Sequence, residues 1–173
     1  MAFNGFAPSN IPDEFSNLVK MKRFYMEESN LVGEIPEWIV NFTSLDYLDL
    51  VSNNLNGKIP QSLFLLKKLT YVGLSQNKLS GEIPKEIKSL GMTGIDLSKN
   101  ELTGLIPESF GKWKSLTHLV MNNNRLTGEI PVSICLLPNL YMLDLSGNQI
   151  SGGIPSQIGN LKRSSLNLSS NLL

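Results

Sequence analysis

Few side chains in this sequence have the types and spacing needed for acid–base or nucleophilic chemistry. Its 173 residues include one histidine, His118, and one cysteine, Cys135. A lone histidine gives no Ser-His-Asp or Cys-His set with a separate orienting base, and Cys135 lies between apolar neighbours, as a small buried hydrophobe does. No Cys/His cluster has the spacing of zinc ligands. The sequence therefore predicts a protein that is not an enzyme and holds no metal or other cofactor.

Charge and hydropathy exclude further classes. The 15 basic and 15 acidic residues give a formal net charge of zero, whereas binding to nucleic acid or to an anionic membrane requires a basic surface. Apolar runs such as Ile134 to Leu137 are far too short to span a bilayer, and the opening MAFNGFAPSN lacks the charged and apolar parts of a signal peptide. We therefore expect no nucleic-acid partner and no direct membrane insertion of this segment.

Tyrosine and aspartate could serve recognition instead, and their positions recur. Tyrosine offers contact area with few rotamers to freeze, and aspartate offers charge. Three tyrosines recur at intervals of 22 and 24 residues and three aspartates at 47 and 48: Tyr25, Tyr47, Tyr71, Asp49, Asp96 and Asp144. These intervals indicate that a repeated unit positions them.

The prolines reveal this unit. Seven of the nine follow isoleucine, at intervals of 24, 24, 24, 23, 24 and 24 residues: Pro12, Pro36, Pro60, Pro84, Pro107, Pro131 and Pro155. Aligned on them, the chain follows the pattern LxxLxLxxNxLxGxIPxxLxxLxx. A period of this length is typical of a solenoid, in which each unit buries its leucines against its neighbours.

Each part of the pattern has a structural role. The LxL segment has a period of two and predicts a short strand with inward leucines, so that stacked copies form a parallel sheet. Glycine allows a conformation or a close approach that a Cβ would block, and proline keeps its segment extended. An asparagine can satisfy backbone groups where the chain leaves the strand. The predicted structural asparagine ladder is Asn53, Asn77, Asn100, Asn124, Asn148 and Asn171.

These motifs resemble those of a known family. The segments LVGEIPEWIVNFTSLDYLDLVSNNLNGKIP and LTHLVMNNNRLTGEIPVSICLLPNLYMLDLSGNQISGGIP resemble plant-type leucine-rich repeats (LRRs), with their LxGxIP signature. The stretch IPDEFSNLVKMKRFYMEESNLVGEIP is similar to part of the ectodomain of HAESA-like peptide-hormone receptor kinases. The resemblance implies an α/β-type repeat solenoid: a right-handed LRR superhelix with a parallel concave β-sheet and a mostly irregular or short 3-10 helical convex side.

The resemblance also implies a function and a location. It indicates part of a plant receptor-kinase ectodomain, outside the cell at the plasma membrane, that binds a secreted peptide or protein ligand on its concave face or presents a lateral edge to an LRR co-receptor. The extracellular location rests on the resemblance, because the sequence shows no signal peptide or transmembrane segment.

We expect one solenoid over residues 1–173, with about seven repeats of 23–24 residues and a partial eighth. The family usually flanks its repeats with cysteine-bearing caps, and none occurs here, so an internal fragment or a truncated gene product is expected. Two repeats are one residue short, around Gly91–Met92 and around Arg163. Local irregularity is expected at both.

Ligand contacts in a solenoid come from outward strand residues, because inward residues build the core. The predicted ligand-binding concave face contains Arg23, Tyr25, Tyr47, Asp49, Tyr71, Asp96, His118 and Asp144. Gly73 and Gly94 beside the tyrosines suggest a strip on which an extended peptide could lie, with the glycines admitting its backbone. Two alternatives stay open: tyrosine is common on exposed sheet faces, and aspartate in this pattern can hydrogen-bond locally.

Charge is shared unevenly between the two faces. Acidic residues outnumber basic ones at the outward strand positions and their flanks, whereas most lysines fall on the convex segments. A mildly acidic concave face favours a basic or N-terminally charged ligand.

Two glycosylation sequons occur, at Asn41 (NFT) and Asn167 (NLS). Asn41 falls on a predicted convex turn, where a secreted protein could bear a glycan. Asn167 falls on a predicted strand and is the less favourable site.

Two other functions fit the same repeats. One is a secreted LRR inhibitor of cell-wall-degrading enzymes, similar to polygalacturonase inhibitors. The other is a truncated LRR scaffold that self-associates through exposed solenoid ends, because uncapped ends leave core leucines uncovered.

Overall fold

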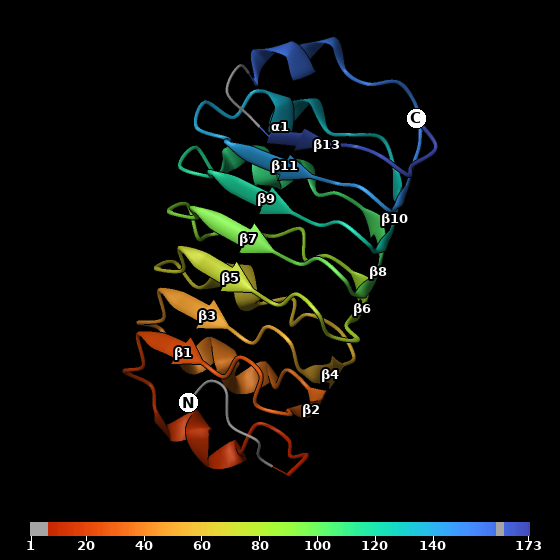
Figure 1. The fold of residues 1–173 in the computed structure, drawn as a ribbon. Helices are drawn as coiled ribbons and strands as arrows, with labels where there is room; N and C mark the ends of the chain where they lie inside the picture. Colours follow the sequence, from red (N-terminus) through yellow and green to blue (C-terminus); the bar gives the residue numbers. More distant parts are fainter. Residues whose placement is uncertain (1–6, 162–164) are drawn as a thin grey trace.

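The computed structural model of the chain describes residues 7–161 and 165–173. Seven short parallel strands follow one another along one side of the molecule (Figure 1). They are β1 (Arg23–Tyr25), β3 (Tyr47–Asp49), β5 (Tyr71–Gly73), β7 (Gly94–Asp96), β9 (His118–Val120), β11 (Met142–Asp144) and β13 (Ser165–Asn167). Each pairs with the equivalent strand of the next repeat, which confirms the predicted parallel sheet of an LRR solenoid.

The middle residue of each strand points into the core. Phe24 is almost completely buried, and Leu48 and Val72 have no exposed surface, whereas the strand residues on either side of them face outward or lie half-buried. This alternation follows from the two-residue period of a strand. The core is continuous from Ile11 to Ile150, so each repeat is buried against its neighbours.

Additional strands form where the sequence analysis predicted only a turn. The segments after the asparagine position make a two-stranded and a four-stranded parallel sheet. These strands are β2 (Val32–Glu34), β4 (Asn54–Asn56), β6 (Ser80–Glu82), β8 (Glu101–Leu105), β10 (Arg125–Gly128) and β12 (Gln149–Ile150). We call the side that they form the lateral side; it lies on the right in Figure 1.

Short helices cover the side opposite the seven-stranded sheet. They are η1 (Asp13–Asn17), η2 (Glu37–Asn41), η3 (Leu63–Leu65), η4 (Glu108–Lys112), η5 (Ser156–Asn160), all 3-10 helices, and the α-helix α1 (Val132–Cys135). The segment between β6 and β7 contains no helix. This is the repeat that is one residue short around Gly91–Met92, so the expected irregularity there is confirmed. The second expected irregularity, at Arg163, lies outside the described residues.

The asparagine column joins consecutive repeats through the backbone. Asn77 is typical: its Oδ1 accepts the N–H of Leu55 at 3.0 Å, and its Nδ2 donates to the carbonyl oxygens of Leu50 at 2.9 Å and Leu74 at 3.1 Å. Leu50 and Leu55 belong to the preceding repeat. The same pattern of bonds is made by Asn53, Asn100, Asn124, Asn148 and Asn171. These amides satisfy backbone groups that the turn would otherwise leave buried and unpaired.

The glycine of the repeat is required by both conformation and space. Gly128 has a φ of +76°, in the left-handed region that other residues rarely adopt. A Cβ at this position would lie 2.3 Å from Leu105 Cδ2 of the preceding repeat. The lateral strands can therefore stack closely only with glycine at this place.

Candidate functional site

The strand register places the predicted site residues in two columns of outward side chains. The first is Arg23, Tyr47, Tyr71, Gly94, His118 and Met142, and the second is Tyr25, Asp49, Gly73, Asp96, Val120 and Asp144. Strands β1, β3 and β5 bring five of the predicted residues together, and Asp96 follows on β7. His118 and Asp144 lie further along, on β9 and β11.

Three tyrosines form a continuous row of rings across β1, β3 and β5. The rings of Tyr47 and Tyr71 are stacked, with centroids 4.3 Å apart and planes 16° apart, and the ring of Tyr25 lies 5.0 Å from Tyr47 at 36°. We call these residues the tyrosine stack. Burial raises the pKa of the Tyr71 phenol, and the neighbouring Tyr47 and Asp49 raise it further. The hydroxyl groups are thus neutral at physiological pH on a pre-ordered aromatic surface.

The prediction that Gly73 and Gly94 admit a ligand backbone is wrong. Both glycines are buried. A Cβ on Gly94 would lie 3.0 Å from Tyr71 Cδ2, and one on Gly73 would lie 3.1 Å from Tyr71 Cε1. The two glycines therefore make room for the Tyr71 ring, which occupies the space that the prediction assigned to a ligand.

The carboxylates of Asp49 and Asp96 each use one oxygen within their own repeat. Asp49 Oδ1 accepts the N–H of Val51 at 3.2 Å, and Asp96 Oδ1 accepts the N–H of Ser98 at 2.9 Å. These bonds confirm the local role that the sequence left open. Within the described part of the chain, neither carboxylate makes an ion pair, and no group donates to its second oxygen.

The electrostatics of this part of the face are acidic. Burial raises the pKa of Asp49, the Val51 N–H bond lowers it, and the charge of Asp96 raises it again. Burial also raises the pKa of Glu27, which lies just beyond β1, and the charges of Asp49 and Glu28 add to this effect. Arg23, the one base at the outward positions of β1 to β7, is paired through Nε with Asp46 Oδ1 at 3.5 Å.

The two remaining predicted residues are held by their neighbours. Asp144 Oδ1 accepts the N–H and the hydroxyl of Ser146 at 3.0 and 2.7 Å, and its Oδ2 accepts Asn167 Nδ2 at 3.4 Å. His118 Nδ1 is hydrogen-bonded to Thr117 Oγ1 at 2.8 Å, and its ring lies 5.9 Å from that of Tyr141. The structure thus places these residues on the same face and engages their polar atoms locally.

The two sequon asparagines differ in their surroundings. Asn41 is exposed at the end of η2, on the convex side. Asn167 lies in β13, where its Nδ2 donates to Asp144 Oδ2 at 3.4 Å and Ser146 Oγ at 3.1 Å, and its Oδ1 accepts the N–H of Ser169 at 3.2 Å. A glycan on Asn167 would replace these bonds, whereas one on Asn41 would meet solvent.

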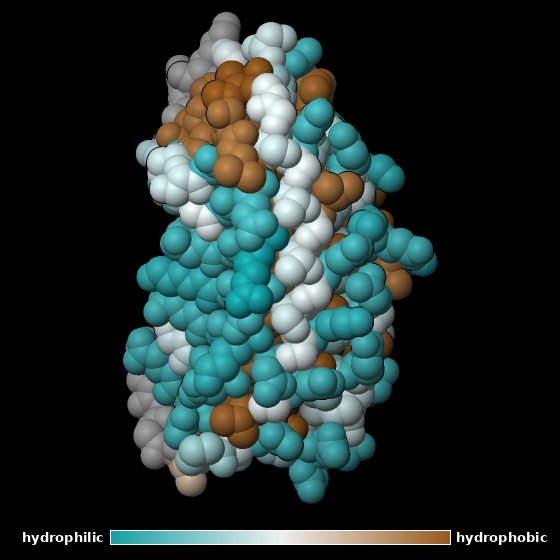
Figure 2. Space-filling view, turned by 90° about the vertical axis from the view of Figure 1, so that its right-hand side faces the viewer, coloured by the Kyte–Doolittle hydropathy of each residue, from teal (hydrophilic) through white to brown (hydrophobic). Residues whose placement is uncertain are grey.

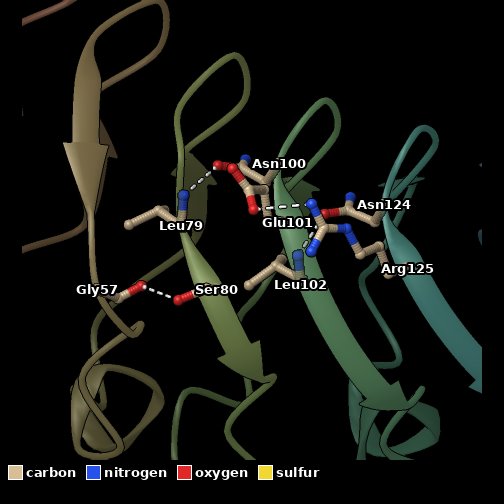
Figure 3. A network of polar contacts seen from close by, with 8 residues as sticks. All are labelled: Gly57, Leu79, Ser80, Asn100, Glu101, Leu102, Asn124 and Arg125. Carbon is tan, nitrogen blue, oxygen red and sulfur yellow. Dashed lines mark hydrogen bonds and ion pairs between the residues drawn. The ribbon is translucent and has the colours of Figure 1, made fainter.

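The lateral side carries polar groups that the sequence analysis did not consider. Arg125 Nη2 pairs with Glu101 Oε2 at 2.9 Å, and Ser80 Oγ donates to the carbonyl oxygen of Gly57 at 3.2 Å (Figure 3). Figure 2 views this side directly: a pale stripe of intermediate hydropathy runs along it between hydrophilic residues, and hydrophobic residues gather near one end. The alternation within NxLxG was the signal that could have identified these outward positions.

The described residues give no sign of a metal site or a membrane span. Among residues 7–161 and 165–173, no three His, Cys, Asp or Glu side chains come together as ligands of a metal ion. Nor does any helix in these ranges have the length and apolarity to cross a membrane. Cys135 is buried, as predicted, and burial raises the pKa of its thiol.

The fold and the repeated site geometry define an LRR solenoid, and comparison with family models agrees. One leucine rich repeat model matches residues 91–150, and a second matches residues 44–66 and 68–90. The chain belongs to the leucine-rich-repeat family. A comparison with curated protein sequences found no match.

Solved structures similar to this chain are mostly plant receptor ectodomains. The plant peptide hormone receptor RGFR1, in complex with RGF2, is 37% identical over 95% of this chain, with a TM-score of 0.91. The Arabidopsis receptor kinase HAESA, in complex with the peptide hormone IDA and the co-receptor SERK1, is 33% identical over 99%, with a TM-score of 0.80. The BIR2 ectodomain from Arabidopsis thaliana is 37% identical over 78%, with a TM-score of 0.65.

The shares of these relatives that the chain matches differ widely. The chain spans 27% of the RGFR1 chain and 33% of the HAESA chain, but 68% of the BIR2 chain. The repeats are thus of the plant receptor-ectodomain type.

Proposed function

We propose that this LRR solenoid is a non-catalytic recognition module that acts outside the cell, and that its concave face binds an extended secreted peptide. The observation that carries this proposal is the tyrosine stack on β1, β3 and β5. Two similar structures, RGFR1 and HAESA, are described as complexes with peptide hormones, which supports the same class of ligand here.

The tyrosine stack has the physical properties of a peptide-binding surface. Its rings are already packed against one another, so little side-chain entropy is lost when a ligand covers them. Tyrosine also combines apolar area with a hydroxyl that can bond to a peptide backbone. Strands about 4.8 Å apart spread three rings over about 10 Å, which matches roughly three residues of an extended peptide.

The binding surface that we propose extends from the tyrosine stack to its charged neighbours. It comprises Arg23, Tyr25, Tyr47, Asp49, Tyr71 and Asp96, with His118 and Asp144 further along the face. HAESA is described with the co-receptor SERK1, and we propose an LRR co-receptor as a second partner of this chain.

A selection from random peptides tests the proposal without a known ligand. A display library of random 12-residue peptides, about 10 to 15 residues being enough to cross several strands, is selected against the protein and counter-selected against the double variant Tyr47→Ala/Tyr71→Ala. Synthetic copies of the enriched peptides are then titrated by calorimetry. We expect micromolar binding to the wild type and a large loss in the double variant.

The controls separate loss of binding from loss of fold. Circular dichroism and the unfolding midpoint of the double variant are compared with those of the wild type, since both tyrosines lie outside the core. Equal affinity of the enriched peptides for the two folded proteins would contradict a peptide site on the tyrosine stack.

A further inference from the structure

We propose that the concave face over β3, β5 and β7 selects a basic side chain, arginine or lysine, in the bound peptide. This side chain lies above Gly73, between Asp49 and Asp96 and beside the ring of Tyr71. The inference rests on the proposed function and adds the chemical class of one ligand residue.

The geometry leaves a position for such a group. Asp49, Gly73 and Asp96 follow one another in the second outward column, on adjacent strands. The two carboxylates are therefore two strand spacings, about 10 Å, apart with no side chain between them. A Cβ on Gly73 would lie 3.2 Å from Asp49 Oδ1 and 3.1 Å from Tyr71 Cε1, so these groups border the glycine directly.

The charge at this position is uncompensated by the described residues. Asp49 and Asp96 each give one oxygen to a backbone N–H two residues on, and neither takes part in an ion pair. Arg23 is two strands from Gly73 and is paired with Asp46. The two carboxylates also repel each other, since the charge of Asp96 raises the pKa of Asp49. A cation from the ligand would relieve this repulsion.

The aromatic wall favours the same ligand group. The Tyr71 ring is stacked on Tyr47 on one side and reaches over Gly94 on the other, so its position is set before a ligand arrives. A guanidinium or ammonium group is attracted to the face or edge region of an aromatic ring when a carboxylate holds it nearby. Arginine fits best because it pairs with a carboxylate and stacks on a ring at once.

The third carboxylate of the column provides a matched contrast. Asp144 accepts bonds at both oxygens, from Ser146 and from Asn167 Nδ2. Position 120 between Asp96 and Asp144 carries valine, so no gap comparable to Gly73 lies beside Asp144 on that side. Asp144 is therefore expected to contribute little to binding of a cation.

The test uses the peptides enriched by the wild-type protein in the random-library selection. We expect them to share an arginine or lysine at one fixed position. Replacing arginine by citrulline, which keeps the shape and removes the charge, or lysine by acetyl-lysine, should weaken binding about tenfold at low salt. In the double variant Asp49→Asn/Asp96→Asn the same replacement should change affinity by less than about twofold.

The variants are designed to preserve the fold. Asparagine keeps an Oδ1 that can accept the N–H of Val51 or Ser98, so the local turn is retained. Asp144→Asn is the control and should leave the tenfold effect of citrulline intact. Tyrosine-dependent binding without a shared basic residue, or a citrulline effect that persists in the double variant, would overturn this inference and leave the proposed function standing. Failure to enrich any peptide over the Tyr47→Ala/Tyr71→Ala protein would overturn both.

Discussion

Strands β1 to β7 and strands β9 to β13 belong to one parallel sheet with continuous register, but their outward side chains are held in different ways. In the first group, tyrosine rings stack on one another, and Asp49 and Asp96 each bond locally through one oxygen. In the second group, Asp144 bonds through both oxygens and His118 is bonded to Thr117. The first group therefore keeps unused binding capacity that the second spends on its own structure.

This difference separates two properties of the repeat. The asparagine bonds and the buried strand residues are the same in both groups, so they support the fold equally. The outward residues are free to vary, because no neighbour in the core depends on them. Binding is thus expected to be local to part of a uniform scaffold, and variants in equivalent repeats can test this.

The largest expected effect concerns the scaffold and should be the same in both groups. Asn77 and Asn148 are 9% and 8% exposed and make matching bonds. Asn77→Ala and Asn148→Ala should each lower the free energy of unfolding by about 3 kcal/mol, because several buried backbone groups lose a partner. Urea denaturation measures both. Values that differ by more than about 1 kcal/mol would show that the scaffold is not uniform.

The next effect should appear in the first group alone. Tyr47→Ala or Tyr71→Ala is expected to weaken binding of a selected peptide by about 30-fold, as for a central aromatic contact. Tyr141→Ala, which removes a ring that is 56% exposed beside His118, should change affinity by less than about twofold. Calorimetry of the three variants decides this, and an equal loss in Tyr141→Ala would end the distinction between the two groups.

A smaller effect is expected where Tyr71 covers glycine. In Gly94→Ala the new Cβ would lie 3.0 Å from Tyr71 Cδ2, so the ring must shift. We expect a stability loss of about 1 kcal/mol together with a changed near-ultraviolet circular dichroism signal from the tyrosines. His118→Ala, at the equivalent position of the next strand, is the control and should leave the tyrosine signal unchanged.

The aspartates should respond to neutralisation with opposite signs. Burial raises the folded-state pKa of Asp49, so its charged form weakens the fold as pH rises from the ordinary value of 3.8 through the folded pKa. Asp49→Asn should therefore stabilise by about 0.3 kcal/mol at pH 7, and the gain should vanish in acid. Asp144→Asn should instead lose about 1 kcal/mol, since its Oδ2 would no longer accept Asn167 Nδ2. Denaturation at pH 7 and pH 3 tests both; a loss of stability in Asp49→Asn at pH 7 would contradict the argument.

The smallest effect on binding is expected from the convex side. After expression through a secretory pathway, Asn41 should carry a glycan and Asn167 should not, because the amide of Asn167 is bonded within the sheet. Mass spectrometry of Asn41→Gln and Asn167→Gln checks the assignment. Peptide affinity should be unchanged in Asn41→Gln, because η2 lies away from the tyrosine stack.

Sequence reasoning identified the scaffold well because each repeat states the same constraint again. The strands, the helical convex side and the irregular repeat around Gly91 were all readable from the period and its one-residue gap. The lateral strands were missed because NxLxG contains turn-forming residues. Leu79 is buried within one of them only because the neighbouring repeats supply pairing partners.

The site was harder to predict from the residues. The columns of outward residues followed from the two-residue period, but the role of Gly73 and Gly94 was misread. A glycine in a strand indicates a close approach, and the pattern cannot say whether a ligand or a neighbouring side chain makes it. Here the Tyr71 ring makes it, in contact with both glycines.

The sequence by itself determined the solenoid, its repeat length, its buried column and the identity of every outward position, because these depend on periodicity along the chain. Only the tertiary structure decided which outward groups are already engaged: that Tyr71 stacks on Tyr47, that Asp144 is held by Asn167, and that Asp49 keeps one oxygen unused. Such contacts join residues that lie a full repeat apart, and they depend on rotamers and on strand spacing. Periodicity places these side chains in register but does not fix which of them bond to one another.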